Sequence, residues 1–186
     1  MKLTVRVFIL ASVFLGCASV VAAQDSAQVV RQDQQMVSIT AYTPTAESCR
    51  GVALISPGAG GSEHGYRYLG ETMASLGYLA AVVGHPESGR SAVREHMRGN
   101  GLREGLAELI TEPEAYRGRF MDIAAARKWA QGRCGASEFL LIGHSMGAAT
   151  VMMEAGARNK LGIQGSDADR KSTRLNSSHL VISYAV

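Results

Sequence analysis

One ten-residue stretch restricts the fold more than any other part of the chain: Phe139 to Ala148, with the sequence FLLIGHSMGA. Its first four residues are apolar and predict a strand that is buried on both faces, as in a parallel sheet. The small and apolar residues after Gly147 predict a helix. A strand, a sharp turn with Gly-x-Ser-x-Gly and a helix are the pattern of a nucleophile elbow. We therefore expect Ser145 at the turn, with its hydroxyl raised above the sheet.

The two glycines of this motif have a steric reason to be there. Gly143 and Gly147 flank the turn, where a Cβ atom is expected to collide with the neighbouring strand or helix. Ser145 itself is expected to have a strained backbone. The alternative is a structural turn without chemistry, but the predicted strand before the motif and the helix after it favour a nucleophile.

The rest of the chain alternates between strands and helices. Strands are expected over residues 36–42, 52–55 and 78–83, and helices over residues 63–76 and 120–131. The polar residues 87–118 are expected to be irregular, with one candidate helix over 102–110. The expected inner positions of the two helices are Tyr68, Leu69, Met73 and Leu76, and Ile123, Ala124 and Trp129. Strands that alternate with helices predict an α/β fold with a parallel sheet.

The first 23 residues have the features of a secretory signal. Two basic residues precede an apolar run over 7–21, and Val-Ala-Ala offers small residues for cleavage before Gln24. The run is short for a membrane span, so no span is expected in the mature chain. Cys17 is an alternative site for a lipid anchor, because the residues around it resemble a lipobox. Either way we expect a secreted or periplasmic protein, with residues 24–35 as a flexible N-terminus.

Residues 169–186 differ in kind from the rest of the chain. Residues 169–179 can be written in codons as a common short-read sequencing adapter, and residues 180–186 fit its continuation in the same frame. A natural basic tail is the alternative. We interpret the segment as an artefact and exclude it from the fold prediction, which leaves a partial domain over residues 36–168.

Charge and motifs exclude several classes of protein. The whole chain has a net charge of +3, but residues 24–168 contain 14 Lys and Arg against 15 Asp and Glu, a net charge of −1. We therefore expect no nucleic-acid partner. The histidines are scattered, and neither Cys-x-x-Cys nor His-Glu-x-x-His occurs, so no metal is expected. No cofactor is expected either.

Three motifs together resemble a known superfamily. They are Ser56-Pro57-Gly58-Ala59-Gly60-Gly61, Gly77-Tyr78 before a strand that ends at His85-Pro86, and the elbow itself. Over about residues 36–157 the chain resembles the α/β-hydrolases, and within them the secreted dienelactone-hydrolase-like branch, related to platelet-activating-factor acetylhydrolases and some polyester hydrolases. The resemblance implies an α/β-hydrolase fold with helices on both faces of the sheet, truncated after the elbow helix.

The chain departs from this pattern at two positions. The family often has Asp where this chain has Gly84. Dienelactone hydrolases proper use a cysteine nucleophile, whereas this chain has Ser145. The second departure argues against a dienelactone as the substrate.

The expected chemistry is acyl transfer on Ser145. The negative oxygen that forms on the carbonyl needs fixed N–H donors. One donor is expected to be the amide of Met146, next after the nucleophile, and the second, by resemblance, the amide of Ala59. Gly58 and Gly60 let this loop approach a substrate closely. The alternatives for the loop are a phosphate cradle or a plain flexible turn, but it lacks the Lys-Ser/Thr of a P-loop.

The base and its orienting acid are the gap in this prediction. In the superfamily the acid and then the histidine follow the serine, and only 23 residues lie between Ser145 and residue 169. His179 has the right order but lies in the excluded tail, and Asp167 is too near the elbow helix. We therefore expect the printed chain to be inactive and its elbow strand to be an exposed edge. The other histidines are expected to pack under the turn (His144), to line the cleft or serve structure (His85), or to lie on the surface (His64 and His96).

Two cysteines of the mature part each precede a predicted buried strand. In the superfamily those strands are parallel neighbours, so Cys49 and Cys134 are expected at the same end of the sheet. A disulfide and two separate buried thiols are both open.

Three functions follow as hypotheses. The first is a secreted serine esterase that acts on small or polymeric carboxylic esters. The second is a non-catalytic, hydrolase-like binding protein. The third is a membrane-anchored lipoprotein.

Overall fold

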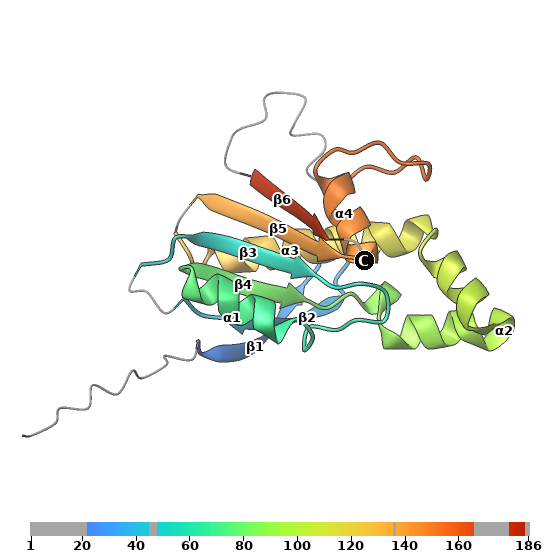
Figure 1. Ribbon diagram of the computed structural model, residues 1–186, viewed down its shortest axis with the longest axis horizontal. Coiled ribbons are helices and arrows are strands. Elements are labelled where there is room, and N and C mark those ends of the chain that lie inside the picture. Colours follow the sequence, from blue (N-terminus) through green and yellow to red (C-terminus); the bar gives the residue numbers. More distant parts are fainter. Residues whose placement is uncertain (1–21, 45–47, 136, 166–178, 185–186) are drawn as a thin grey trace, which may run out of the picture.

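A six-stranded sheet forms the centre of the computed structural model, which describes residues 22–44, 48–135, 137–165 and 179–184 (Figure 1). The strand order is β1-β2-β4-β3-β5-β6. The last four strands of that order are parallel, and the first two form an antiparallel hairpin that joins them through β2. The bounds are β1 Gln24–Val30, β2 Met36–Tyr42, β3 Gly51–Ser56, β4 Tyr78–Val83, β5 Glu138–His144 and β6 His179–Tyr184. The carboxyl ends of the parallel strands therefore meet at one edge of the sheet, where ligands bind in open α/β folds.

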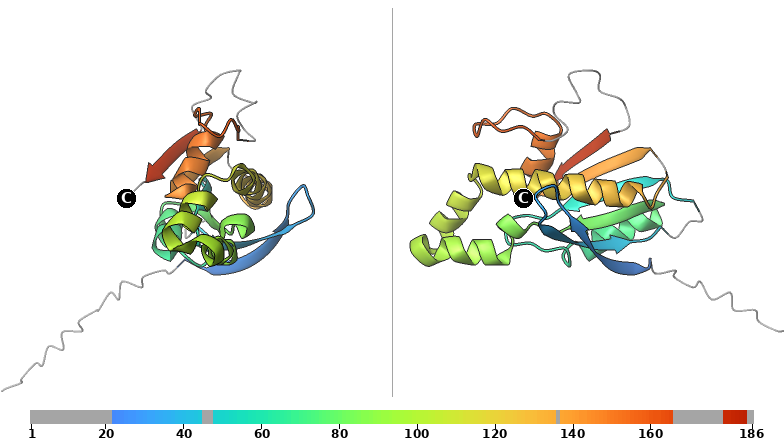
Figure 2. Two further views of the ribbon diagram at one scale, coloured as in Figure 1. Left: turned by 90° about the vertical axis from the view of Figure 1, so that its right-hand side faces the viewer. Right: turned by 180° about the vertical axis from the view of Figure 1, so that it is seen from behind.

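Helices cover both faces of this sheet. Helix α1 (Arg67–Ser75) packs on one face, whereas α3 (Pro113–Gln131) and α4 (Met146–Glu154) pack on the other. In Figure 1 α1 lies in front of the strands, and in the view from behind in Figure 2 α3 lies in front of them. Every residue of β3 and β4 is buried, as their continuous apolar sequences predict. The predicted strands and the predicted parallel sheet with helices on both faces are confirmed.

The N-terminal segment is more ordered than its polar sequence predicts. Residues 24–35 were expected to be flexible, but Gln24–Val30 pairs with β2 along its whole length, from Gln24 opposite Tyr42 to Val30 opposite Met36. Only one face of an edge strand needs apolar residues, and in β1 that face has Val29 buried in the core. Just beyond the strand, Arg31 is buried and forms ion pairs with Asp122 and Glu87.

The segment between β4 and β5 is helical where an irregular insert was expected. Helix α2 (Arg90–Leu109) extends beyond the carboxyl edge of the sheet and bends at Gly101, whose φ is 79° and ψ is 178° (Figure 1). Helix α3 begins at residue 113 rather than 120, with Pro113 in its first turn, where proline is well tolerated. The insert is polar because most of α2 faces solvent, so its helical periodicity is weak.

Helix α1 is shorter than predicted, and several expected inner positions are wrong. The helix begins at Arg67 instead of residue 63, because Tyr66 before it has a left-handed backbone with φ of 58°. Tyr68 is 68% and Leu76 55% exposed, whereas Met73 is buried. In α3, Ile123 is buried and Trp129 half-buried, but Ala124 is exposed.

The elbow strand is not the edge of the sheet, contrary to the sequence-based expectation. Residues 179–184 form β6, which runs parallel to β5 from His179 opposite Phe139 to Tyr184 opposite His144. The sequence of β6, HLVISY, is rich in the β-branched and aromatic residues that favour strands. The segment that we excluded from the fold prediction thus contributes a strand.

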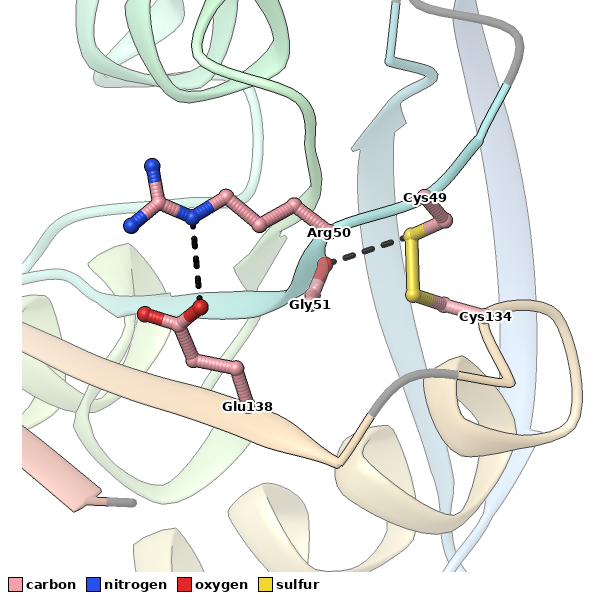
Figure 3. The surroundings of a disulfide bond; sticks show 5 residues. All are labelled: Cys49, Arg50, Gly51, Cys134 and Glu138. Carbon is pink, nitrogen blue, oxygen red and sulfur yellow. Dashed lines mark hydrogen bonds and ion pairs between the residues drawn. A yellow bond between two sulfur atoms is a disulfide. The ribbon is translucent and has the colours of Figure 1, made fainter. Parts of the chain in front are cut away.

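A disulfide joins two elements at the amino edge of the sheet (Figure 3). Cys49 lies just before β3 and Cys134 just after α3, and their Cα atoms are 5.6 Å apart. Beside the disulfide, Arg50 Nε donates to Glu138 Oε2 at 3.2 Å. The sequence left the state of the two cysteines open, and the structure pairs them. None of the helices among the described residues is long and apolar enough to cross a membrane.

Candidate active site

Ser145 lies at the tip of the turn between β5 and α4, as the motif predicts. It is exposed, and its φ of 54° and ψ of −121° are rare for a residue with a side chain. A Cβ atom on Gly143 would lie 2.3 Å from the carbonyl oxygen of Gly147, and one on Gly147 would lie 2.0 Å from that of Ser56. Only glycine fits at either position, so the turn can be this sharp.

The loop after β3 runs directly beside Ser145. A Cβ atom on Gly58 would lie 3.1 Å from Ser145 Cβ. The loop holds its own shape through the amide of Gly61, which donates to Gly58 O at 3.0 Å, and the amide of Gly60, which donates to Ser88 O at 2.8 Å. The loop backbone is therefore fixed at close range to the exposed hydroxyl.

Two amides of this region have no acceptor among the described residues: those of Ala59 in the loop and Met146 at the start of α4. Met146 occupies the first helical position, where the helix dipole favours negative charge. The turn, the loop and these two amides can together accommodate an oxygen that becomes negative beside Ser145.

A second serine, histidine and aspartate are connected in the order of a catalytic triad, but they are buried. His85 Nε2 lies 2.9 Å from Ser56 Oγ, and His85 Nδ1 lies 2.8 Å from Asp122 Oδ2. Ser56 and Asp122 are 0% exposed and His85 is 5% exposed, so no substrate can reach this serine. His85 is thus structural, which is one of the two roles expected for it.

Electrostatics favours the neutral form of His85 in this buried cluster. Burial, together with the charges of Arg119 and Arg31, holds the pKa of His85 well below its usual value of 6.5. A neutral His85 donates from Nδ1 to Asp122 and accepts at Nε2 from the hydroxyl of Ser56. Burial raises the pKa of Asp122 to about 7, and the hydrogen bond from Arg31 opposes that shift.

Sequence reasoning missed the polar residues of α3. Arg119 and Asp122 are fully buried on a helix whose other buried positions are mostly apolar or small. A charged residue at an inward position of an amphipathic pattern is the signal that could have found them.

The structure brings none of His64, His85 and His96 to Ser145. His64 is exposed and lies beside Glu63, and His96 on α2 contacts the carbonyl of Ala92 and the carboxylate of Glu112. His144 is half-buried, and its Nδ1 lies 2.7 Å from the hydroxyl of Tyr66. Asp167 and Cys17 lie outside the described residues.

His179 lies at the far end of the sheet from the elbow. Its backbone pairs with Phe139, five residues before His144. At about 3.3 Å per strand residue, that places its backbone about 17 Å from the elbow. This position agrees with the expectation that His179 is not the base.

Two hollows flank the loop and the elbow. The first, of about 380 Å³, is lined mainly by apolar and aromatic residues and by the strand end that carries the elbow: Ile55, Tyr66, Tyr68, Leu69, Ile142, Gly143 and His144. The second, of about 260 Å³, is lined in part by Gly61 at the end of the loop and is more polar, with Glu63 and Arg90 in its wall.

Gly84, which lines the second hollow, has little room for a side chain. A Cβ atom on Gly84 would lie 2.9 Å from the carbonyl oxygen of Ser38 and 3.2 Å from Glu63 Oε2. The Glu63 carboxylate therefore occupies the space that a side chain at position 84 would need.

Comparisons with known proteins identify the fold. No protein-family model matches the sequence, and no curated protein matches it. A highly thermostable carboxyl esterase from Bacillus coagulans is similar in structure, with 20% identity and a TM-score of 0.51, over 72% of this chain and 39% of that chain. A zinc-bound, cold-adapted esterase from an Arctic intertidal metagenomic library has 17% identity and a TM-score of 0.52, over 75% of this chain and 56% of that chain.

The chain therefore spans 39% to 56% of the length of these two structures. At such low identity the similarity shows the fold and not the activity. The mostly parallel sheet, the helices on both faces and these structural neighbours establish an α/β-hydrolase fold.

Proposed function

We propose that this α/β-hydrolase-fold chain is a serine hydrolase that cleaves carboxylic esters through an acyl-enzyme on Ser145. The supporting observation is the conjunction of an exposed serine in a strained turn with two amides, on the loop and on the helix beside it, that have no acceptor among the described residues. The two structural neighbours described above are both called esterases, which agrees with the proposal. The finer resemblance to the dienelactone-hydrolase-like branch stays a prediction.

In the proposed reaction the hydroxyl oxygen of Ser145 attacks the ester carbonyl carbon and gives its proton to a general base. The carbonyl oxygen becomes negative and accepts hydrogen bonds from the amides of Met146 and Ala59. The tetrahedral intermediate then expels the alcohol, which takes up the proton, and leaves the acyl group on Ser145. Water repeats the sequence, releases the acid and restores the serine.

By the resemblance, the base in this proposal is a histidine of the full-length gene product that follows Ser145 in the superfamily's order and is oriented by an Asp or Glu. His85 does not fit that role, because its Nε2 already accepts from the buried hydroxyl of Ser56. His179 does not fit it either, because its backbone lies at the opposite end of β5.

The substrate class is part of the proposal. The hollow beside the elbow has an apolar lining with two tyrosines, Tyr66 and Tyr68, which suits an apolar acyl or alcohol group. Both small esters and single units of a polyester have this chemistry.

Export is proposed on separate grounds. The secretory-type N-terminus and the Cys49–Cys134 disulfide agree with an oxidising compartment. The mass of the exported protein separates cleavage before Gln24 from a diacylglyceryl adduct on Cys17.

Covalent labelling tests the catalytic proposal. The full-length gene product is incubated with a fluorophosphonate probe, and the modified peptide is identified by mass spectrometry. We expect label on Ser145, no label on Ser145→Ala, and unchanged labelling of Ser75→Ala, which alters an exposed serine at the end of α1. A folded protein that is not labelled, but binds p-nitrophenyl esters without hydrolysing them, would instead support the non-catalytic binding protein.

A further inference from the structure

One buried arginine on α3 contacts both sides of the candidate site. Arg119 is 0% exposed, and its Nε donates to Thr150 Oγ1 at 2.9 Å. Its Nη1 donates to Ser88 Oγ at 2.5 Å, and its Nη2 donates to Ser56 Oγ at 3.1 Å and to Pro57 O. All four acceptors are neutral, and in the part of the chain that the structure describes no carboxylate lies within ion-pair distance of Arg119.

On the loop side, these hydrogen bonds hold the backbone before and after Ala59. Arg119 binds the carbonyl of Pro57, two residues before Ala59. After Ala59, the amide of Gly60 donates to the carbonyl of Ser88, whose hydroxyl accepts from Arg119. A single guanidinium therefore restrains both flanks of the Ala59 amide.

On the elbow side, the same guanidinium reaches the first turn of α4. Thr150 Oγ1 accepts from Arg119 and donates to Met146 O at 2.9 Å. The backbones of the two sides also touch, because a Cβ atom on Gly147 would lie 2.0 Å from Ser56 O. Arg119 thus connects the peptide groups around both amides that we propose as oxyanion donors.

Stability alone is a poor explanation for this residue. A buried cation loses its hydration, and a well-packed apolar side chain of similar length is often as stabilising. Burial lowers the pKa of Arg119 to about 10, so the side chain is still charged at neutral pH. What an apolar residue cannot supply is several hydrogen bonds in fixed directions from one planar group.

We propose that Arg119 is a positioning residue that sets the spacing between the Ala59 and Met146 amides. The proposal rests on the function proposed above, because the spacing of the two amides matters for catalysis only if an oxyanion binds there. Displacements of about 1 Å in such a site can cost about 100-fold in rate.

The direct test measures the two backbones and needs no catalysis. Amide hydrogen exchange is compared between the full-length gene product, Arg119→Met, Arg119→Lys and Arg117→Met. Arg117 is the matched control, an exposed arginine on the same helix whose side chain pairs with Glu114. We expect Arg119→Met to exchange about tenfold faster or more over residues 57–61 and 146–150 together, and Arg117→Met to match the unsubstituted protein. Unchanged exchange at both segments in a folded Arg119→Met protein overturns the proposal.

The second test measures the consequence for Ser145. Fluorophosphonate labelling is resolved into probe affinity and maximal labelling rate. We expect Arg119→Met to lower the maximal rate about 10- to 100-fold with little change in affinity, and Arg119→Lys to recover part of the loss through a single donor. A fall in affinity alone, or no fall in rate when exchange has risen, overturns the role in positioning. If the unsubstituted protein is not labelled at all, the proposed function fails while the exchange test still decides whether Arg119 holds the two segments.

Thr150→Val keeps the test decisive if Arg119→Met does not fold. This change removes one acceptor of Arg119 and the hydroxyl that donates to Met146 O, with the shape of the side chain preserved. We expect faster exchange over residues 146–150 only, and a smaller fall in the maximal labelling rate. Faster exchange spread evenly over the chain would indicate a purely structural role and contradict the proposal.

Discussion

The two ends of the central sheet connect the same elements by different chemistry. At the amino end, the Cys49–Cys134 disulfide joins the start of β3 to the end of α3, and the exposed Arg50–Glu138 ion pair joins β3 to β5 (Figure 3). At the carboxyl end, the buried side chain of Arg119 on α3 binds the loop after β3 and the helix after β5. One end has a covalent bond and solvated charges, and the other has directional hydrogen bonds to backbone and hydroxyl oxygens.

The two kinds of connection have different effects: one mainly changes the stability of the fold, and the other mainly fixes the positions of atoms in the folded chain. A disulfide mainly restricts the unfolded chain and demands little of the atoms around it. Several hydrogen bonds from one guanidinium do the opposite, because they constrain where particular peptide groups lie in the folded state. The constrained end is the one where the strand ends, the loop and the elbow meet. We therefore expect changes at this end to alter the geometry of the candidate site, and changes at the amino end to alter mainly the stability of the fold.

Removal of the disulfide should cause the largest loss of stability and should not change the reactivity of Ser145. The disulfide closes a loop with a sequence separation of 85 residues. Replacement of both Cys49 and Cys134 by Ala is expected to lower the free energy of unfolding by about 4 kcal/mol in the chain-entropy model. Urea unfolding measures this loss. The rate of Ser145 labelling per folded molecule should not change, and a tenfold fall under conditions where the variant is folded would contradict the separation of the two ends.

Removal of one backbone donor should have the second-largest effect, and on rate more than on stability. An ester in place of the peptide bond before Ala59, introduced with an α-hydroxy acid, deletes that N–H and weakens the carbonyl of Gly58, which accepts from the amide of Gly61. The rate of ester hydrolysis should fall about 10²- to 10³-fold, or about 2.7 to 4 kcal/mol in the barrier.

The matched control is the same exchange before Gly60, whose amide donates to Ser88 O instead. It should lower the free energy of unfolding more and the rate less. Equal rate losses for the two esters would mean that the Ala59 amide has no special role.

Local pattern was sufficient to predict much of the fold. The continuous apolar runs of β3, β4 and β5 have one interpretation in an α/β chain, and the glycines of the elbow have one steric reason. Strand β1 was missed because an edge strand needs only Val29 on its inner face. Helix α2 was missed because a solvent-exposed helix has little apolar periodicity.

Residues of the candidate site could be predicted from the sequence only where they lie within a short local motif. Ser145, Met146 and Ala59 lie in two short motifs, and the structure places those motifs side by side. The contacts of Arg119 join residues separated by 31 to 63 positions in the sequence. No local pattern contains such pairs, and only the inward place of a charged residue on α3 hints at them.

The two ends of the sheet also differ in backbone strain, and relief of this strain should have the third-largest effect, on stability. At the amino end the positive φ before β4, 90°, belongs to Gly77, where it costs little. At the carboxyl end the positive φ of 54° belongs to Ser145, where a Cβ atom makes it costly. Ser145→Gly and Ser145→Ala should both abolish labelling, but the glycine variant should be more stable than the alanine variant by about 1 kcal/mol.

The opposite change, which adds a Cβ atom to a glycine at the amino end, tests whether the strain is specific to the elbow. Gly77→Ala introduces a Cβ atom at a positive φ at the amino end and should destabilise the protein by about 1 kcal/mol with labelling unchanged. Thermal unfolding of the three variants measures both differences. If the glycine at position 145 is no more stable than the alanine, the elbow stores no strain.

Removal of the exposed Arg50–Glu138 ion pair at the amino end should have the smallest effect on stability. This effect can be recognised by its dependence on pH. The hydroxyl of Tyr78 donates to Glu138 Oε1 at 2.6 Å, and this bond, with a further contribution from Arg50, lowers the pKa of the Glu138 carboxyl. A carboxyl whose pKa is lower in the folded than in the unfolded chain contributes stability above its ordinary pKa of about 4.3. That contribution is lost as the pH falls from this value through the folded pKa, because the unfolded chain then binds the proton first.

Glu138→Gln should therefore lower the urea midpoint slightly at pH 7 and not at all in acid. The difference between the two proteins should shrink below about pH 4.3 and also in high salt, because exposed charges are screened. Changes that both proteins share, including protonation of His85 and Asp122, cancel in the difference. A difference that persists undiminished at acid pH would show that Glu138 acts through packing and not through its charge. It would contradict the comparison between solvated charges at the amino end and a buried cation at the carboxyl end.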